Sequence, residues 1–137
     1  RAPVAAWARE GAGAREGVSA SAPSLPRSLS PMRALRFHAH GRPADVLRLD
    51  DVPAPEPGPG EVRVRLTHRP VHPSDLSAVA GTYGALRALP AVGGNEGAGV
   101  VDAVGAGVEG LAVGTRVVKL GDAPTWQEHA VLPAELA

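Results

Sequence analysis

The side chains best suited to proton chemistry lie between residues 72 and 96. Tyr83 stands in a Thr-Tyr-Gly loop sequence, and an unperturbed phenol, with a pKa near ~10, stays protonated at neutral pH. Such a hydroxyl can donate a proton or hold a developing oxyanion by a hydrogen bond. A loop tyrosine can equally anchor its ring on the fold, so position alone leaves both roles open.

Three more residues of this stretch and one tryptophan complete the candidate set. His72 either lines a site or serves as a structural hydrogen-bonding group. Asn95 either bonds the backbone of its glycine-rich turn or helps to place a ligand. Glu96 is either a paired carboxylate that orders the site or an acid–base group itself. Trp126 either borders a pocket or belongs to the core.

Metal binding is not expected. The chain has no cysteine, which excludes thiolate metal sites, thiolate nucleophiles and disulfides. The remaining histidines show no metal-ligand spacing; they are His38, His40, His68 and His129.

The sequence GAGVEG at 105–110 has the spelling of a dinucleotide-binding loop, G-x-G-x-x-G. A loop that binds a pyrophosphate ends a strand and opens a helix. Here a second Val-rich strand follows, so we expect a hairpin connection with no dinucleotide bound to it.

Hydrophobic periodicity indicates a mainly β fold. Residues 61–66 alternate strictly, with Val62, Val64 and Leu66 on one face. The other expected strands cover 33–38, 46–50, 98–104, 115–120 and 126–132. Their spacing predicts a partly open β-barrel and no βαβ alternation.

Turn and cap residues separate these strands. A turn at Gly41–Pro43 joins the first two, and the alternating prolines of 53–59 predict a stiff extended connector. Pro73 opens one short helix, with Asp75 in its first turn, and Gly81 ends it.

Length and charge limit the function classes. The chain has 137 residues, with 14 basic and 14 acidic side chains. This supports one domain and gives no reason to expect nucleic acid or an anionic membrane surface as a partner. No run of about 18 apolar residues is present, so no membrane span is expected.

Residues 1–31 differ from the rest in their Ala, Ser, Arg and Pro content. This segment is expected to be a disordered leader or a tail resembling a transit peptide, with Met32 as the natural start. Residues 32–137 then form the folded domain. The location is taken as cytoplasmic, or mitochondrial if 1–31 is a true transit peptide.

Three strings resemble one family. PAPEPGPGEVRVRL, HPSDLSAVAGTYG and GGNEGAGVVDAVGAGVEGLAVGTRVV resemble the GroES-like catalytic domain of the medium-chain dehydrogenase/reductase superfamily. The likeness spans residues 32–137. Zinc-dependent members carry Cys where this chain has His72 and His where it has Asn95. The resemblance is therefore to the zinc-free branches, which usually carry Asn at the position of His72.

The run PSDLSAVAGTYGALRALPAVGGNEG is similar to the 2-enoyl thioester reductase branch. This resemblance implies hydride transfer from NADPH to an enoyl thioester, with Tyr83 as the proton donor. The pocket for substrate or nicotinamide would include His72, Asn95, Glu96 and Trp126. The family's cofactor domain follows the position of Ala137. The chain is thus expected to be an N-terminal portion, inactive alone and homodimeric when whole.

Three alternatives stay open at this stage. Quinone reduction is the nearest, within the same superfamily and with a quinone as the small-molecule substrate. A non-catalytic GroES-like barrel module is the second, although such a module does not need the GGNEGAGVV run. A truncated, inactive gene product is the third.

Overall fold

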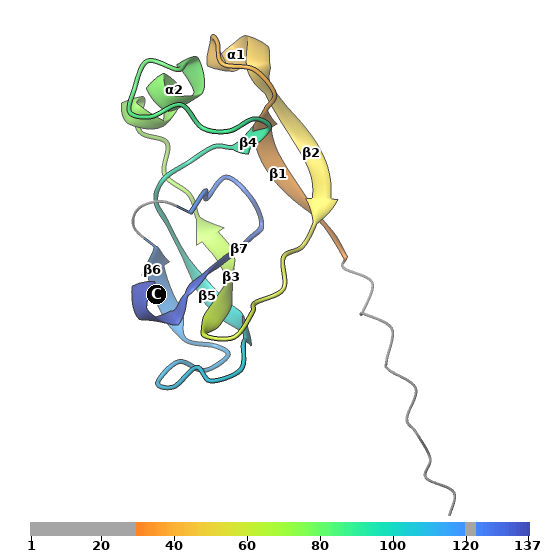
Figure 1. The fold of residues 1–137 in the computed structure, drawn as a ribbon, viewed down its shortest axis with the longest axis vertical. Coiled ribbons are helices and arrows are strands. Elements are labelled where there is room, and N and C mark those ends of the chain that lie inside the picture. The colour runs from red at the N-terminus through yellow and green to blue at the C-terminus, as the bar shows by residue number, and fades with distance from the viewer. Residues whose placement is uncertain (1–29, 120–122) are drawn as a thin grey trace, which may run out of the picture.

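The computed structural model describes residues 30–119 and 123–137, and Figure 1 shows that strands dominate it. The predicted mainly β fold is confirmed, and the structure has two short helices, one more than the motifs predicted. The predicted tail at 1–31 lies almost wholly outside the described residues, so this domain division stays a prediction. In chain order the elements are β1 (Pro31–Phe37), α1 (Pro43–Val46), β2 (Leu47–Pro53), β3 (Glu61–His68), α2 (Pro73–Ala80), β4 (Ala91–Val92), β5 (Gly97–Val104), β6 (Arg116–Lys119), β7 (His129–Pro133) and the 3₁₀ turn η1 (Ala134–Leu136).

The larger sheet has four antiparallel strands in the order β6-β5-β3-β7. The alternation predicted for 61–66 is confirmed, because Val62, Val64 and Leu66 are at most 3% exposed. Val101 of β5 and Leu132 of β7 pack against them. Burying each such side chain contributes about 1.5–3 kcal/mol, so this face holds the main core.

The smaller sheet has the order β2-β1-β4. Phe37, at the end of β1, is fully buried, and it shares a second core cluster with Val79 of α2, Ala91 of β4 and Trp126. This cluster fixes α2 against the smaller sheet. In Figure 1 the two sheets form separate groups of strands, with α1 and α2 side by side above the smaller one.

A short segment joins the two sheets. Gln127 forms an isolated antiparallel bridge with Ala34 of β1. The N–H of Leu35 donates to the Trp126 carbonyl at 2.7 Å, and the N–H of Leu66 donates to the Glu128 carbonyl at 2.9 Å. The strand predicted at 126–132 therefore begins only at His129, because the preceding residues pair with β1 before the chain reaches β3.

Other predicted elements are confirmed with modest changes. The connector at 54–58 carries no regular structure, and 105–115 joins β5 to antiparallel β6 as a hairpin. The turn expected at Gly41–Pro43 is instead followed by α1, since Pro43 and Asp45 suit a first helical turn and the Arg42 carbonyl accepts two N–H bonds. None of the helices in the described ranges is long and apolar enough to cross a membrane.

Candidate active site

Helix α2 begins and ends where its cap residues predict. Pro73 occupies the first helical turn and His72 precedes it as the N-cap. The backbone N–H of His72 donates to Oδ2 of Asp75 at 2.8 Å. Gly81 ends the helix in the left-handed region with φ 79°. Both ends of the helix are therefore fixed by local chemistry.

A chain of hydrogen bonds runs from this helix to the next loop. Asp75 is only 1% exposed, and its Oδ1 accepts a bond from Nδ2 of Asn95 at 2.6 Å. The amide oxygen of Asn95 accepts a bond from Arg87. Because a carboxylate only accepts and a guanidinium only donates, one orientation of the Asn95 amide satisfies both partners. Asn95 thus links a buried carboxylate to a cation, and these two contacts are to side chains, whereas the structural alternative expected bonds to the backbone of its turn.

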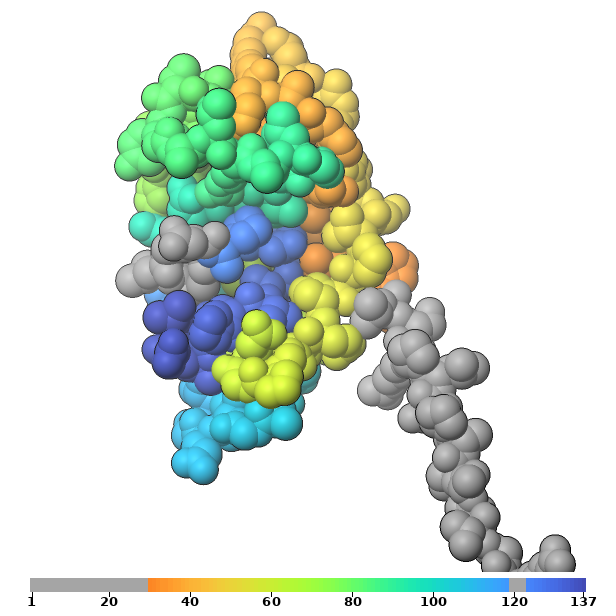
Figure 2. Space-filling model, in the orientation of Figure 1, coloured from red at the N-terminus to blue at the C-terminus, as the bar shows by residue number. Residues whose placement is uncertain are grey.

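Tyr83 stands in the loop between α2 and β4 and is 57% exposed. It lines a hollow of about 390 Å³ together with Ala78, Leu86, Arg87 and Asn95. The exposed side chain of Tyr83 is therefore accessible to a ligand in this hollow. Figure 2 shows α2 and the following loop gathered at one end of the molecule.

His72 and Glu96 form a pair beside this region. Nε2 of His72 lies 3.2 Å from Oε2 of Glu96, and each side chain is about half exposed. Glu96 directly follows Asn95, and His72 caps the helix that carries Asp75. The structure therefore brings together four of the five predicted site residues. Tyr83 and Asn95 line one hollow, and His72 pairs with Glu96, the residue after Asn95.

Trp126 does not line the hollow that contains Tyr83. It is 7% exposed, and its Nε1–H donates to the Pro70 carbonyl at 3.2 Å. A Cβ added to Gly93 would lie 2.2 Å from the indole, and one added to Gly94 would lie 2.4 Å from it. The tryptophan thus packs on the two glycines that precede Asn95. It also borders a second hollow of about 310 Å³, beside Leu49 and Val71.

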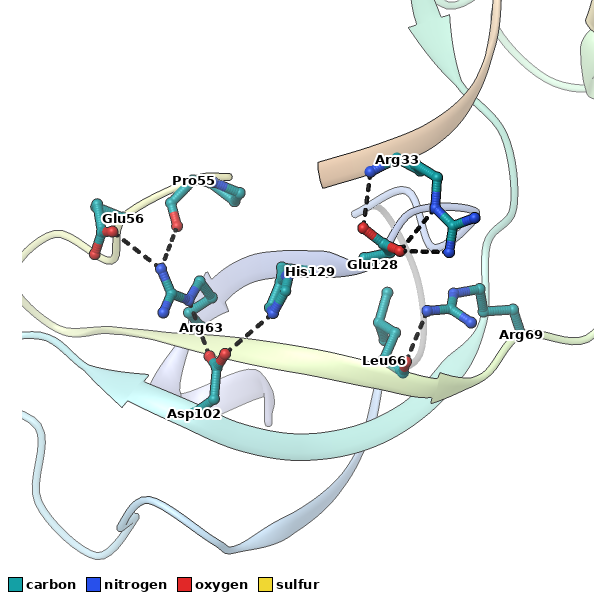
Figure 3. A network of polar contacts seen from close by, with 9 residues as sticks. All are labelled: Arg33, Pro55, Glu56, Arg63, Leu66, Arg69, Asp102, Glu128 and His129. Carbon is teal, nitrogen blue, oxygen red and sulfur yellow. Dashed lines mark hydrogen bonds and ion pairs between the residues drawn. The ribbon is translucent and has the colours of Figure 1, made fainter. Parts of the chain in front are cut away.

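Polar contacts on the larger sheet form a separate network, drawn in Figure 3. Asp102 accepts a bond from Arg63 at 2.9 Å and lies 3.1 Å from His129. The hydrogen bond to Asp102 raises the pKa of Arg63 above its ordinary value. Arg63 also reaches Glu56 of the connector at 3.0 Å. These contacts tie the connector to three strands, and none of their residues lines the hollow with Tyr83.

A second pair in Figure 3 joins the two sheets. The backbone N–H of Arg33 donates to Oε2 of Glu128 at 2.8 Å, and its guanidinium donates to Oε1 at 2.9 and 3.0 Å. The backbone bond first, and the guanidinium bonds next, lower the pKa of Glu128.

Sequence reasoning did not single out Arg87. A signal was present, because Arg87 is the only charged residue between Asp75 and Glu96. A lone cation within twenty mostly apolar or small residues needs a polar partner when it is partly buried. Periodicity could not say which partner it takes.

The described residues contain no group of three His, Cys, Asp or Glu side chains that could hold a metal ion. Asn95 stands with its amide committed to Asp75 and Arg87. His72 and Glu96 leave a two-donor set, fewer than the three protein ligands of a catalytic zinc site.

A family model described as the alcohol dehydrogenase GroES-like domain matches residues 58–135. The mitochondrial enoyl-[acyl-carrier-protein] reductase of Rattus norvegicus is 41% identical over 131 residues, which make up 95% of this chain and 34% of that protein. The chain spans about a third of the length of the curated relatives it matches.

Solved structures give the same fold. A putative NADPH:quinone reductase from Bacillus thuringiensis superposes with a TM-score of 0.71 at 37% identity, covering 77% of this chain and 32% of that one. A cobalt- and zinc-bound alcohol dehydrogenase from Pyrobaculum aerophilum gives a TM-score of 0.69 at 30% identity, covering 77% and 40%. The fold is thus shared by proteins of more than one chemistry, and the site residues must distinguish them.

Proposed function

Because the chain belongs to the family of the alcohol dehydrogenase GroES-like domain, as its motifs predicted, we propose that it is the N-terminal part of an oxidoreductase that reduces 2-enoyl thioesters. The observation that carries this proposal is the 41% identity over 95% of the chain to an enoyl-[acyl-carrier-protein] reductase. The reaction of the whole protein would be hydride addition to the β-carbon and proton addition to the α-carbon of the substrate.

Tyr83 is the proposed proton donor. Its side chain is exposed and lines a hollow of about 390 Å³, which has room for the reacting carbons of a thioester. After hydride addition the substrate carries an enolate, and the Tyr83 O–H gives its proton to the α-carbon, leaving a phenolate that water reprotonates. Asn95 and Arg87 border the same hollow and would hold the loop around the substrate.

The hydride would come from a bound nicotinamide cofactor, which we propose to be NADPH. The GAGVEG loop does not fit the pyrophosphate of such a cofactor, because it joins antiparallel β5 and β6 and opens no helix. The cofactor's main contacts are therefore assigned to sequence beyond this chain.

The resemblance implies a homodimer, which light scattering on the whole protein would test.

We propose that the site works without zinc. The chain has no cysteine, and the Asn95 amide is held between Asp75 and Arg87. In place of a metal ion, hydrogen-bond donors of the whole protein would polarise the carbonyl oxygen of the proposed substrate. Zinc analysis of the purified protein by mass spectrometry tests this; one zinc per chain would contradict it.

The test of the function begins with the coding sequence after Ala137. We expect an open frame with a strand, a glycine-rich turn and a helix. In the whole protein, Tyr83→Phe is expected to lower kcat for an enoyl thioester by about 10²–10⁴-fold, because it removes the proton donor. Thermal unfolding should stay near that of the wild type, since the side chain is 57% exposed. An unchanged kcat would remove the proposed role.

Quinone reduction is the second candidate, favoured by the 37% identity to a putative NADPH:quinone reductase. It transfers hydride to a quinone and needs no proton on carbon. Parallel assays with a short enoyl thioester and a small quinone separate the two. Under this alternative the quinone would be the better substrate, and Tyr83→Phe would leave its reduction largely intact.

For the location, the mitochondrial alternative is the one we propose. The rat relative, which is named as a mitochondrial protein, aligns over 95% of the chain. A fusion of residues 1–31 to a fluorescent protein tests whether this segment directs import. Fluorescence that remains in the cytoplasm would contradict the mitochondrial proposal and support a cytoplasmic location.

A further inference from the structure

The loop that carries Tyr83 is secured at its two ends. At the start, the N–H of Thr82 donates to the Ser77 carbonyl at 2.9 Å, which continues the end of α2. At the far end, Ala91 and Val92 pair with β1. Among the described residues, no backbone-to-backbone hydrogen bond holds positions 83–90 between these ends. Any hydrogen bond that holds the middle of the loop must therefore involve a side chain.

Arg87 supplies the principal contacts there. Its Nη1–H donates to the Val92 carbonyl at 2.7 Å, and its Nη2–H donates to Oδ1 of Asn95. The carbonyl of the same residue lies 3.3 Å from Nε2 of His40. Arg87 follows Tyr83 by four residues and lines the same hollow. The Arg87 side chain thus connects the middle of the loop to Val92 and Asn95, which precede Glu96 in the chain.

Asn95 also connects the guanidinium of Arg87 to a negatively charged group. The Asn95 amide stands between the guanidinium and the buried carboxylate of Asp75. Polar groups in such a chain polarise one another, which strengthens each bond at low local dielectric. The loop is therefore connected to the first turn of α2 through an ordered line of three side chains.

We propose that Arg87 is a positioning residue for Tyr83: it holds the tyrosine loop over the hollow by fixing the loop to Asn95 and Val92. The expected effect on catalysis rests on the proposed function, whereas the expected effect on the loop rests on the contacts alone. An arginine suits two acceptors at a fixed angle, whereas a lysine presents a point charge that reaches one of them.

The first experiment reads the loop directly. Tyr83 is the only tyrosine among these 137 residues. In the whole protein labelled with 3-fluorotyrosine, its ¹⁹F resonance is identified as the one that Tyr83→Phe removes. In Arg87→Met this resonance is expected to move toward the position of free 3-fluorotyrosine, because the loop is released. In Arg87→Lys it should lie between the two. The matched control is Arg42→Met, since Arg42 is 77% exposed and meets Asp45 only at 4.0 Å; it should leave the resonance unchanged.

The second experiment reads the consequence in the whole protein. Arg87→Met is expected to lower kcat for the enoyl thioester at least about tenfold with little change in KM, because a misplaced donor slows proton transfer without weakening binding. Arg87→Lys should recover part of kcat. A rise in KM alone would assign Arg87 to substrate binding and overturn the proposal.

The two experiments separate failure of the proposal from failure of the function. If the ¹⁹F resonance of both Arg87 variants coincides with the wild type, Arg87 does not hold the loop, whatever the reaction is. If the resonance moves as expected but Tyr83→Phe keeps full kcat, the loop contact stands and the proton-donor role fails. Should Arg87→Met not fold, Arg87→Lys still decides the first question.

Discussion

The four-stranded sheet β6-β5-β3-β7 and the segment of residues 81–96 (the site segment) are held by different kinds of contact. In the sheet, apolar side chains of every strand face one core, and backbone ladders repeat the same bond along each pair. In the site segment, backbone bonds secure the two ends, and one arginine, one asparagine and the fit of two glycines against an indole hold the rest.

This difference has consequences for how each region fails. The sheet has many equivalent contacts, so a truncation costs stability in proportion to the apolar area removed. The site segment has few contacts, each of a different type, so a single change releases one part of it. The sheet is the rigid support, and the site segment is where substitutions should alter function with less effect on global stability.

The largest stability effect is expected in the sheet. Leu66→Ala removes a side chain that is 3% exposed within the main core, and it should lower the free energy of unfolding by about 2–5 kcal/mol. Urea unfolding measures this loss. The control is Leu49→Ala, because Leu49 is 65% exposed and its truncation should change stability by less than about 0.5 kcal/mol. Equal losses for the two variants would mean that the sheet core is not the dominant support.

A smaller effect is expected where the site segment meets Trp126. Gly93→Ala places a Cβ 2.2 Å from the indole, which forces the ring or the backbone to shift at a cost of about 1–3 kcal/mol. The same substitution in a Trp126→Leu background should cost less, since the clashing ring atoms are gone. A double-mutant cycle on urea unfolding gives this coupling. Additive losses would show that the glycine is required for another reason.

The sheet could be predicted well because its signals are local. Val62, Val64 and Leu66 recur with the period of a half-buried strand. Pro73 and Gly81 predict the two ends of α2 to within one residue. The hairpin at 105–115 followed from the absence of a helix after its glycines. Each of these inferences used residues close in sequence.

The site could be predicted only in part, because its contacts are distant and particular. Tyr83 and Asn95 do line one hollow, whereas Trp126 lies outside that hollow and packs against Gly93 and Gly94, more than thirty residues earlier in the chain. The two-residue strand β4 has no period to detect, since its pairing with β1 defines it. Arg87 differs from a surface arginine only through its acceptors, which no sequence pattern specifies.

The smallest effect is expected at the contact between the two sheets, where Glu128 receives three bonds from Arg33. The pKa of Glu128 is lowered in the folded chain. A carboxyl with a lowered folded pKa stabilises the fold above its unfolded pKa of about 4.3, and this contribution disappears as the pH falls through the folded value. Glu128→Gln removes the charge but keeps an acceptor, so its Tm should lie below the wild type at pH 7 and approach it near pH 2.

The cause of the shift can be divided by a second variant. The backbone N–H of Arg33 is the largest cause, and no side-chain substitution removes it. In an Arg33→Met background, Glu128→Gln should therefore keep most of its pH-dependent difference in Tm. Loss of the whole difference would assign the effect to the guanidinium, whose side chain is 66% exposed and hence screened by solvent. Retention would mean that a backbone bond accounts for most of the electrostatic stabilisation where the two sheets meet.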